Sequence, residues 1–68
     1  MNNNYNRMEV LNLFDEVENA KKDLNIAREN FNNAPMELVD YYSYRIKSLE
    51  AKYDYLLKQT KDMNLSKF

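Results

Sequence analysis

The side chains that could carry out chemistry in this 68-residue chain are serines, carboxylates and tyrosines, because it contains no histidine and no cysteine. Acid and base catalysis near neutral pH most often uses histidine, and nucleophilic catalysis most often uses cysteine or a serine beside a base. Ser43, Ser48 and Ser66 have no base predicted beside them. The residue types therefore predict a protein that is not an enzyme and has no catalytic residues.

A cluster of acidic residues in the segment FDEVE could in principle hold a hard cation; it consists of Asp15, Glu16 and Glu18. Acidic residues in the first half of a helix are also favoured by the helix dipole, without any metal. The Glu-x-x-His pattern of metal sites in helical bundles cannot be built without histidine. We predict no metal and no cofactor.

Tyrosines are concentrated in one short stretch, since five of the six lie between Val39 and Leu57. Tyr42 and Tyr53 fit an apolar seam, where a ring can be buried while its hydroxyl reaches water. A second series of residues, spaced by three and four, is rotated away from that seam. It consists of Tyr41, Tyr44, Ser48, Ala51 and Tyr55.

Two helices of similar length must position these residues, because apolar side chains recur at steps of three and four in both halves of the chain. The helices are expected at about 7–32 and 35–63. The first seam consists of Val10, Leu13, Val17, Ala20, Leu24, Ala27 and Phe31. The second consists of Val39, Tyr42, Ile46, Leu49, Tyr53, Leu56, Thr60 and Met63.

Residues suited to helix ends flank both segments. Asn6 followed by Glu9 resembles a capping box at the start of the first helix. Asn32 and Asn33 tolerate a left-handed helix end, and Pro35 suits the first position of the second helix. A short turn between matched seams predicts an antiparallel hairpin.

Charges beside the seams support antiparallel pairing in two possible registers. A turn near Asn33 would place Glu16 near Lys52 and Asp23 near Arg45. A register shifted by one heptad would pair Lys21 with Glu50 and Asp23 with Lys52. Exposed pairs of this kind contribute only about 0 to 1 kcal/mol each, so they leave the register open.

A single all-α domain over residues 1–68 is expected, with 1–5 and 65–68 frayed. A two-helix core is thin, and chains this short often need a disulfide, a metal or a second subunit for stability. We therefore expect a homo-oligomer, a dimer first, assembling into a four-helix bundle or a related helical oligomer. Two alternatives remain: the chains could exchange helices, and the oligomer could be a tetramer. The expected interface consists of Tyr41, Tyr44, Ala51, Tyr55, Phe14 and Leu57, with Leu11 and Ile26 as further contributors.

The alternative for the tyrosines is that their rings lie along the helix surface and reflect an AT-rich codon usage. Ten basic and eleven acidic residues give a net charge of -1, spread along the chain. Nucleic-acid binding, which needs a basic face, is disfavoured by this balance, and so is binding to a membrane surface. No segment has the apolar length of a membrane span. We expect a cytoplasmic protein.

The segment MELVDYYSYRIKSLEAKYDYLLKQTKDMNL resembles the YaaL-like family of small uncharacterised bacterial proteins. Ala34 departs from that family, which commonly has an acidic residue before the proline, and this weakens the cap. The N-terminal half is similar only in its helical pattern. The matching residues are Pro35, Glu50-Ala51-Lys52-Tyr53, Leu56-Leu57, Lys61 and Asn64-Leu65.

The resemblance implies a short cytoplasmic helical protein without a known activity, with a protein partner in DNA maintenance or sporulation. Lys52, Lys58 and Lys61, together with Tyr55, are the exposed residues that the motif would use, although EAKY also suits simple helix packing. The predicted function is a self-associating protein-interaction module with an unknown protein partner. The alternative is an accessory protein that stacks single-stranded nucleic acid on its tyrosines.

Overall fold

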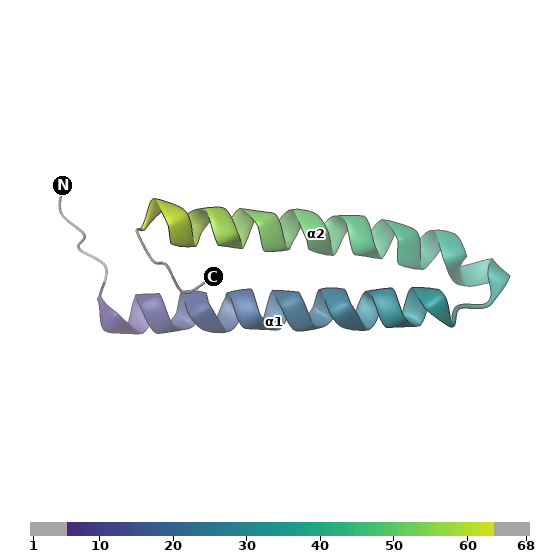
Figure 1. Cartoon of the computed structure of the whole chain (residues 1–68), viewed down its shortest axis with the longest axis horizontal. Coiled ribbons are helices and arrows are strands. Elements are labelled where there is room, and N and C mark those ends of the chain that lie inside the picture. The colour runs from purple at the N-terminus through teal and green to yellow at the C-terminus, as the bar shows by residue number, and fades with distance from the viewer. Residues whose placement is uncertain (1–5, 64–68) are drawn as a thin grey trace.

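The protein is a helical hairpin in the computed structural model, which describes residues 6–63 of the chain. Helix α1 spans Arg7–Asn32, the 3-10 helix η1 spans Met36–Leu38, and helix α2 spans Val39–Asp62. The two α-helices run antiparallel along their whole length (Figure 1). The predicted all-α two-helix hairpin is confirmed. The ends predicted to fray, 1–5 and 65–68, lie outside the described residues.

Helix α1 begins as the capping pattern predicts. The Oδ1 atom of Asn6 accepts a hydrogen bond from the backbone N–H of Glu9 at 2.8 Å. The carboxylate of Glu9 accepts in return from the side-chain amide of Asn6 at 2.9 Å. In a standard capping box the acidic side chain accepts from the backbone N–H of the cap residue. Here Glu9 accepts from the side chain of Asn6, so the pair is a side-chain variant of the capping box.

The turn differs from the prediction at two positions. Asn33 has φ -110° and ψ 9°, which is not left-handed; its side-chain amide instead donates to the carbonyl oxygen of Glu29 at 3.1 Å. Pro35 is extended, at φ -65° and ψ 156°, and precedes η1 as its N-cap. The second helical segment therefore begins one residue later than predicted, and as a 3-10 turn.

The core lies along the line where α1 and α2 face each other. Seven side chains are buried among residues 6–63, five from α1 and two from α2. The half-buried seam residues of α2 are larger than the alanines of α1, and one opposing helix covers only part of each. Buried are Leu13, Val17, Ala20, Leu24, Ala27, Leu56 and Thr60. Half-buried on the seam of α2 are Val39, Tyr42, Ile46, Leu49, Tyr53 and Met63.

The ion pair that links the helices differs from the charge pairs that the two registers predicted. Within residues 6–63 the ion pair is Arg28–Glu50, with 3.1 Å between guanidinium nitrogen and carboxylate oxygen. Neither predicted register contains this pair. The turn occupies Asn33 to Leu38 rather than centring near Asn33. Because the turn is longer than one centred near Asn33, each residue of α1 faces a residue further along α2 than that register predicted, and Val17 and Ala20 pack with Leu56 and Tyr53.

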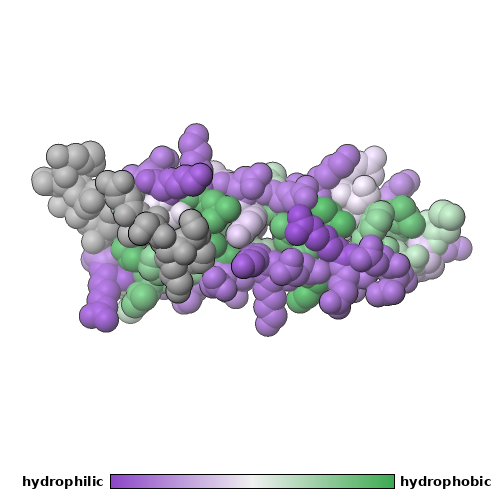
Figure 2. Space-filling model, viewed as in Figure 1, coloured by the Kyte–Doolittle hydropathy of each residue, from purple (hydrophilic) through white to green (hydrophobic). Residues whose placement is uncertain are grey.

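The molecule is a thin rod of 51 × 16 × 15 Å. Its Cα radius of gyration is 15.1 Å, whereas a compact domain of this length has about 11 Å. Hydrophobic residues reach the surface in separate groups between hydrophilic ones, including at the end that holds the turn (Figure 2). Two helices alone thus leave much apolar surface in contact with water.

Candidate interaction face

The second tyrosine series forms a continuous strip along α2. We call it the tyrosine face. Its three tyrosines retain 54%, 70% and 61% of their accessible surface, in chain order. These are large fractions for aromatic side chains, which usually bury most of their surface. The tyrosine face consists of Tyr41, Tyr44, Ser48, Ala51 and Tyr55.

The helical repeat of α2 explains why this strip stays open. At about 100° per residue, the middle of the tyrosine face lies about 140° around α2 from the seam that contacts α1. It therefore points almost directly away from α1. Helix α1 covers one side of α2 only (Figure 1), so α1 cannot shield these rings.

One ring of the tyrosine face is held by a neighbour. Tyr41 packs edge-on against Tyr42, with ring centroids 4.8 Å apart and an interplanar angle of 72°. Tyr42 is half-buried on the seam, so Tyr41 lies against a ring that is itself partly covered. Tyr44 and Tyr55 have no such ring contact within residues 6–63. Their rings are the most open part of the tyrosine face.

Charged residues border the tyrosine face on both edges. On one edge, four charged residues follow one another at seven-residue spacing, and the sign of their charge alternates along the helix. We call this set the alternating edge. The opposite edge carries Arg45 and Lys52 and is basic. None of the charged residues on the two edges forms an ion pair among residues 6–63. The alternating edge consists of Asp40, Lys47, Asp54 and Lys61, which are all exposed.

Two of the residues predicted for the interface lie elsewhere. Phe14 and Leu57 are half-buried, and Leu57 packs against the core cluster of Leu13, Val17, Ala20 and Leu56. By the helical repeat they flank the seam rather than the tyrosine face. The structure thus brings together Tyr41, Tyr44, Ala51 and Tyr55, and leaves Phe14 and Leu57 apart from them.

The three lysines predicted as an exposed motif do not gather at one point. Lys58 and Lys61 lie on the side of α2 that carries the alternating edge. Lys52 lies on the opposite edge, about 120° from Lys58 around the helix. They cannot form one compact basic patch.

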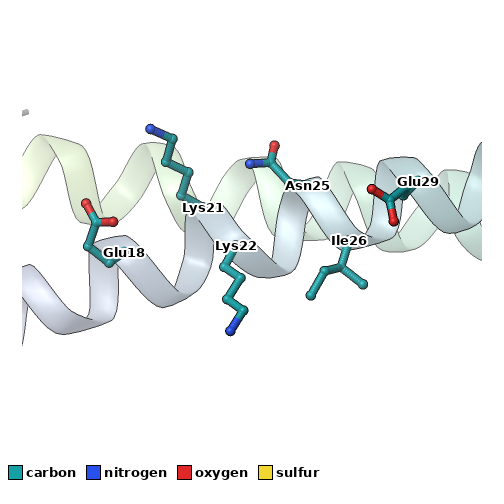
Figure 3. A pocket seen from close by; sticks show the side chains of 6 residues that line it. All are labelled: Glu18, Lys21, Lys22, Asn25, Ile26 and Glu29. Carbon is teal, nitrogen blue, oxygen red and sulfur yellow. The ribbon is translucent and has the colours of Figure 1, made fainter.

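The hollows on the surface of residues 6–63 are open to solvent. The one in Figure 3 is lined by α1 alone, and its Lys21 and Lys22 side chains point in opposite directions. Among residues 6–63, no group of three or more acidic side chains is placed to hold a metal ion. Neither α1 nor α2 combines the length and apolarity that crossing a bilayer requires.

The order of charges along α2 is a feature of the site that the sequence prediction missed. The nearly equal numbers of acidic and basic residues predicted a helix surface without net charge. Such numbers do not show in which order the charges follow one another along α2. The signal was present in the seven-residue spacing of Asp40, Lys47, Asp54 and Lys61. That spacing places residues of alternating sign on one line of a helix.

A family model for a protein of unknown function, DUF2508, matches residues 4–67. The chain belongs to this family. The resemblance to YaaL-like proteins is consistent with the match, which extends over both helices and not only over the C-terminal half. The search of curated proteins found no match, and neither did the search of solved structures. The description of the family gives no function, so the function has to be argued from the tyrosine face.

Proposed function

We propose that this protein is a non-enzymatic helical interaction module that self-associates through the tyrosine face of α2. The observation that carries the proposal is the exposure of Tyr41, Tyr44 and Tyr55 on the side of α2 opposite α1. Tyrosine is enriched in the cores of protein interfaces, where its ring contributes large buried area at a low cost in side-chain entropy. A strip of three such rings is a candidate centre for an interface.

The thin core gives a second reason for association. The seven side chains buried among residues 6–63, three of which are alanine or threonine, bury little apolar area on folding. At roughly 1.5 to 3 kcal/mol for each large buried side chain, such a core barely offsets the conformational entropy of the ordered residues. Burial of the tyrosine face against another helix would add stabilising area without changing the hairpin.

The chemistry of the chain supports a binding role over a catalytic one. Histidine and cysteine are absent from the sequence, and the lysine side chains that line the hollow on α1 diverge (Figure 3). We extend the proposal to a cytoplasmic location and to a further protein partner, which the YaaL-like resemblance implies. The surfaces left for such a partner are the outer side of α1 and the flanks of the hairpin.

The test replaces the three rings together, as Tyr41→Ser, Tyr44→Ser and Tyr55→Ser, and measures mass by sedimentation equilibrium. We expect the wild-type protein to form a dimer and the triple variant to be monomeric at the same concentration. Circular dichroism should show nearly unchanged helicity, because the rings are outside the hairpin core.

A matched control removes three exposed apolar side chains from α1, as Met8→Ser, Leu11→Ser and Ile26→Ser. These side chains are 64%, 46% and 46% exposed, which is similar to the tyrosines, and Leu11 and Ile26, which the sequence suggested as further interface residues, lie on α1 and not on the tyrosine face. The proposal predicts that the control stays dimeric. It is wrong if the control dissociates and the tyrosine variant does not, or if the tyrosine variant loses its helicity with no change in mass.

A second function is favoured by one specific observation. Arg45 and Lys52 border the rings on an edge of α2 that carries no acidic residue, and single-stranded nucleic acid binds to aromatic rings beside positive charge. This alternative predicts binding to an oligonucleotide that weakens steeply as salt is raised. An absence of binding at low salt would remove it.

A further inference from the structure

We propose that two copies of this chain pack α2 against α2 in antiparallel orientation, with a two-fold axis passing between Ser48 and Ala51. This inference rests on the proposed self-association and specifies its geometry. The two α1 helices would lie on the outside, giving a flat layer of four helices rather than a square bundle. The reason is that the tyrosine face points about 140° away from the seam with α1.

The distribution of side-chain size along the tyrosine face fits such an axis. The two small residues, Ser48 and Ala51, lie in its middle, and large rings lie toward both ends. In an antiparallel pair, Ser48 faces Ala51 of the second copy, and the small side chains allow the helices to approach closely. Tyr44 then faces Tyr55 of the second copy, twice by symmetry, so that the two rings can pack against each other.

The same register gives Tyr41 a partner. It faces Lys58 of the second copy, whose ammonium group can lie over the ring as a cation–π contact. Tyr41 is already held edge-on by Tyr42 at 4.8 Å, so its ring is oriented before association. Lys58, which the family resemblance marks as an exposed motif residue, thereby acquires a role at the end of the interface.

Charge complementarity identifies the occupant as a second copy. The alternating edge reads negative, positive, negative, positive from Asp40 to Lys61, and an antiparallel copy presents the reverse order. Lys47 therefore meets Asp54 of the second copy, and Asp40 meets Lys61. The two-fold axis repeats both pairs, so four opposite-charge contacts form between groups that have no ion-pair partner among residues 6–63.

The other edge and the other orientation are less favourable. In the antiparallel pair Arg45 meets Lys52 of the second copy, which gives two like-charge contacts against the four favourable ones. In a parallel pair Asp40 would meet Arg45, but Lys47 would meet Lys52. That orientation gives two favourable and two unfavourable contacts, so the charges favour the antiparallel pair.

The test exchanges one pair of charges, and the dimer dissociation constant is measured by sedimentation equilibrium at low salt. Lys47→Glu and Asp54→Lys each turn two attractive contacts into repulsive ones, so each should weaken the dimer about tenfold. The double variant, Lys47→Glu with Asp54→Lys, restores opposite charges and should return to the wild-type constant. Circular dichroism on each variant checks that the hairpin is intact.

An equal mixture of the two single variants gives the sharpest result. In the mixed dimer, the glutamate introduced at position 47 of one copy faces the lysine introduced at position 54 of the other. The unchanged Asp54 of the first copy faces the unchanged Lys47 of the second, so both contacts are attractive. The mixture should therefore associate as tightly as the wild type, although each variant alone does not. Lys22→Glu and Glu18→Lys, which make the same charge changes on α1, should leave the constant unchanged.

The outcomes separate this geometry from the proposed function. If the wild type dimerises but Lys47→Glu binds equally well, the antiparallel register is wrong while self-association stands. If Lys47→Glu binds more tightly, the pair is parallel, because position 47 would then face Lys52. If the wild type is monomeric at every concentration, the proposed self-association is wrong, and the antiparallel register of the two α2 helices is wrong as well.

Discussion

Thr60 is the polar residue on an otherwise apolar seam, and the structure explains how it is tolerated there. It is 1% exposed, and its hydroxyl donates to the carbonyl oxygen of Leu57 at 2.7 Å. A buried hydroxyl is costly only when it lacks a partner. The spacing of the seam predicted this residue as a core position, and its burial shows that spacing outweighed polarity.

Thr60→Val should leave the free energy of unfolding unchanged or raise it by up to about 1 kcal/mol. The replacement keeps the branched shape and removes a hydroxyl whose bond to a helix carbonyl adds little stability. Thr60→Ala should lower it by about 1 kcal/mol, because a buried methyl group is lost. Chemical denaturation at one fixed protein concentration measures both. A loss larger in Thr60→Val than in Thr60→Ala would show that the hydroxyl is needed.

The helices themselves were predictable because several independent signals coincide. Apolar spacing, the Asn6 cap and a single proline predicted α1 with its observed bounds of Arg7–Asn32. Local chemistry decides where a helix begins, and it can be read from a few neighbouring residues. The start of α2 was less predictable, because whether Met36 to Leu38 form a 3-10 turn or a regular helix depends on how the turn reaches back to α1.

The register of the hairpin could not be predicted from charges. Exposed ion pairs contribute at most about 1 kcal/mol, so they follow the packing of the seam and do not set it. The length of the turn set it instead, and this length depends on the conformations of Asn33 and Pro35. The tyrosine face was predictable because it needs only the repeat of one helix. The helical repeat also places Phe14 and Leu57 beside the seam, but how far they are buried depends on how α1 and α2 are paired.

A double-mutant cycle tests the observed register. Arg28→Gln and Glu50→Gln should show a coupling free energy of about 0.5 kcal/mol, since both side chains are about half exposed. Glu16→Gln with Lys52→Gln, the pair expected for a turn near Asn33, should show none. Denaturation of the four variants in each cycle gives the values. Coupling in the second cycle and not in the first would contradict the structure's register.

The whole molecule is long and thin, and this shape makes association the central question. A rod of 51 × 16 × 15 Å built from two helices has no second layer, among residues 6–63, to cover the far side of α2. Small domains without disulfides or metals gain most from a partner that supplies such a layer. Self-association would also make stability depend on protein concentration, because the dimer and not the monomer would be the stable folded form.

Sedimentation equilibrium of the wild-type protein over a wide range of concentrations tests this claim most directly. Self-association through the tyrosine face predicts a mass that rises from 8.2 kDa to twice that value as the concentration increases, and then stays there. A well-folded monomer at every concentration would contradict it. The tyrosine face would then be vacant, and Tyr41, Tyr44 and Tyr55 would be the residues with which to search for a different partner.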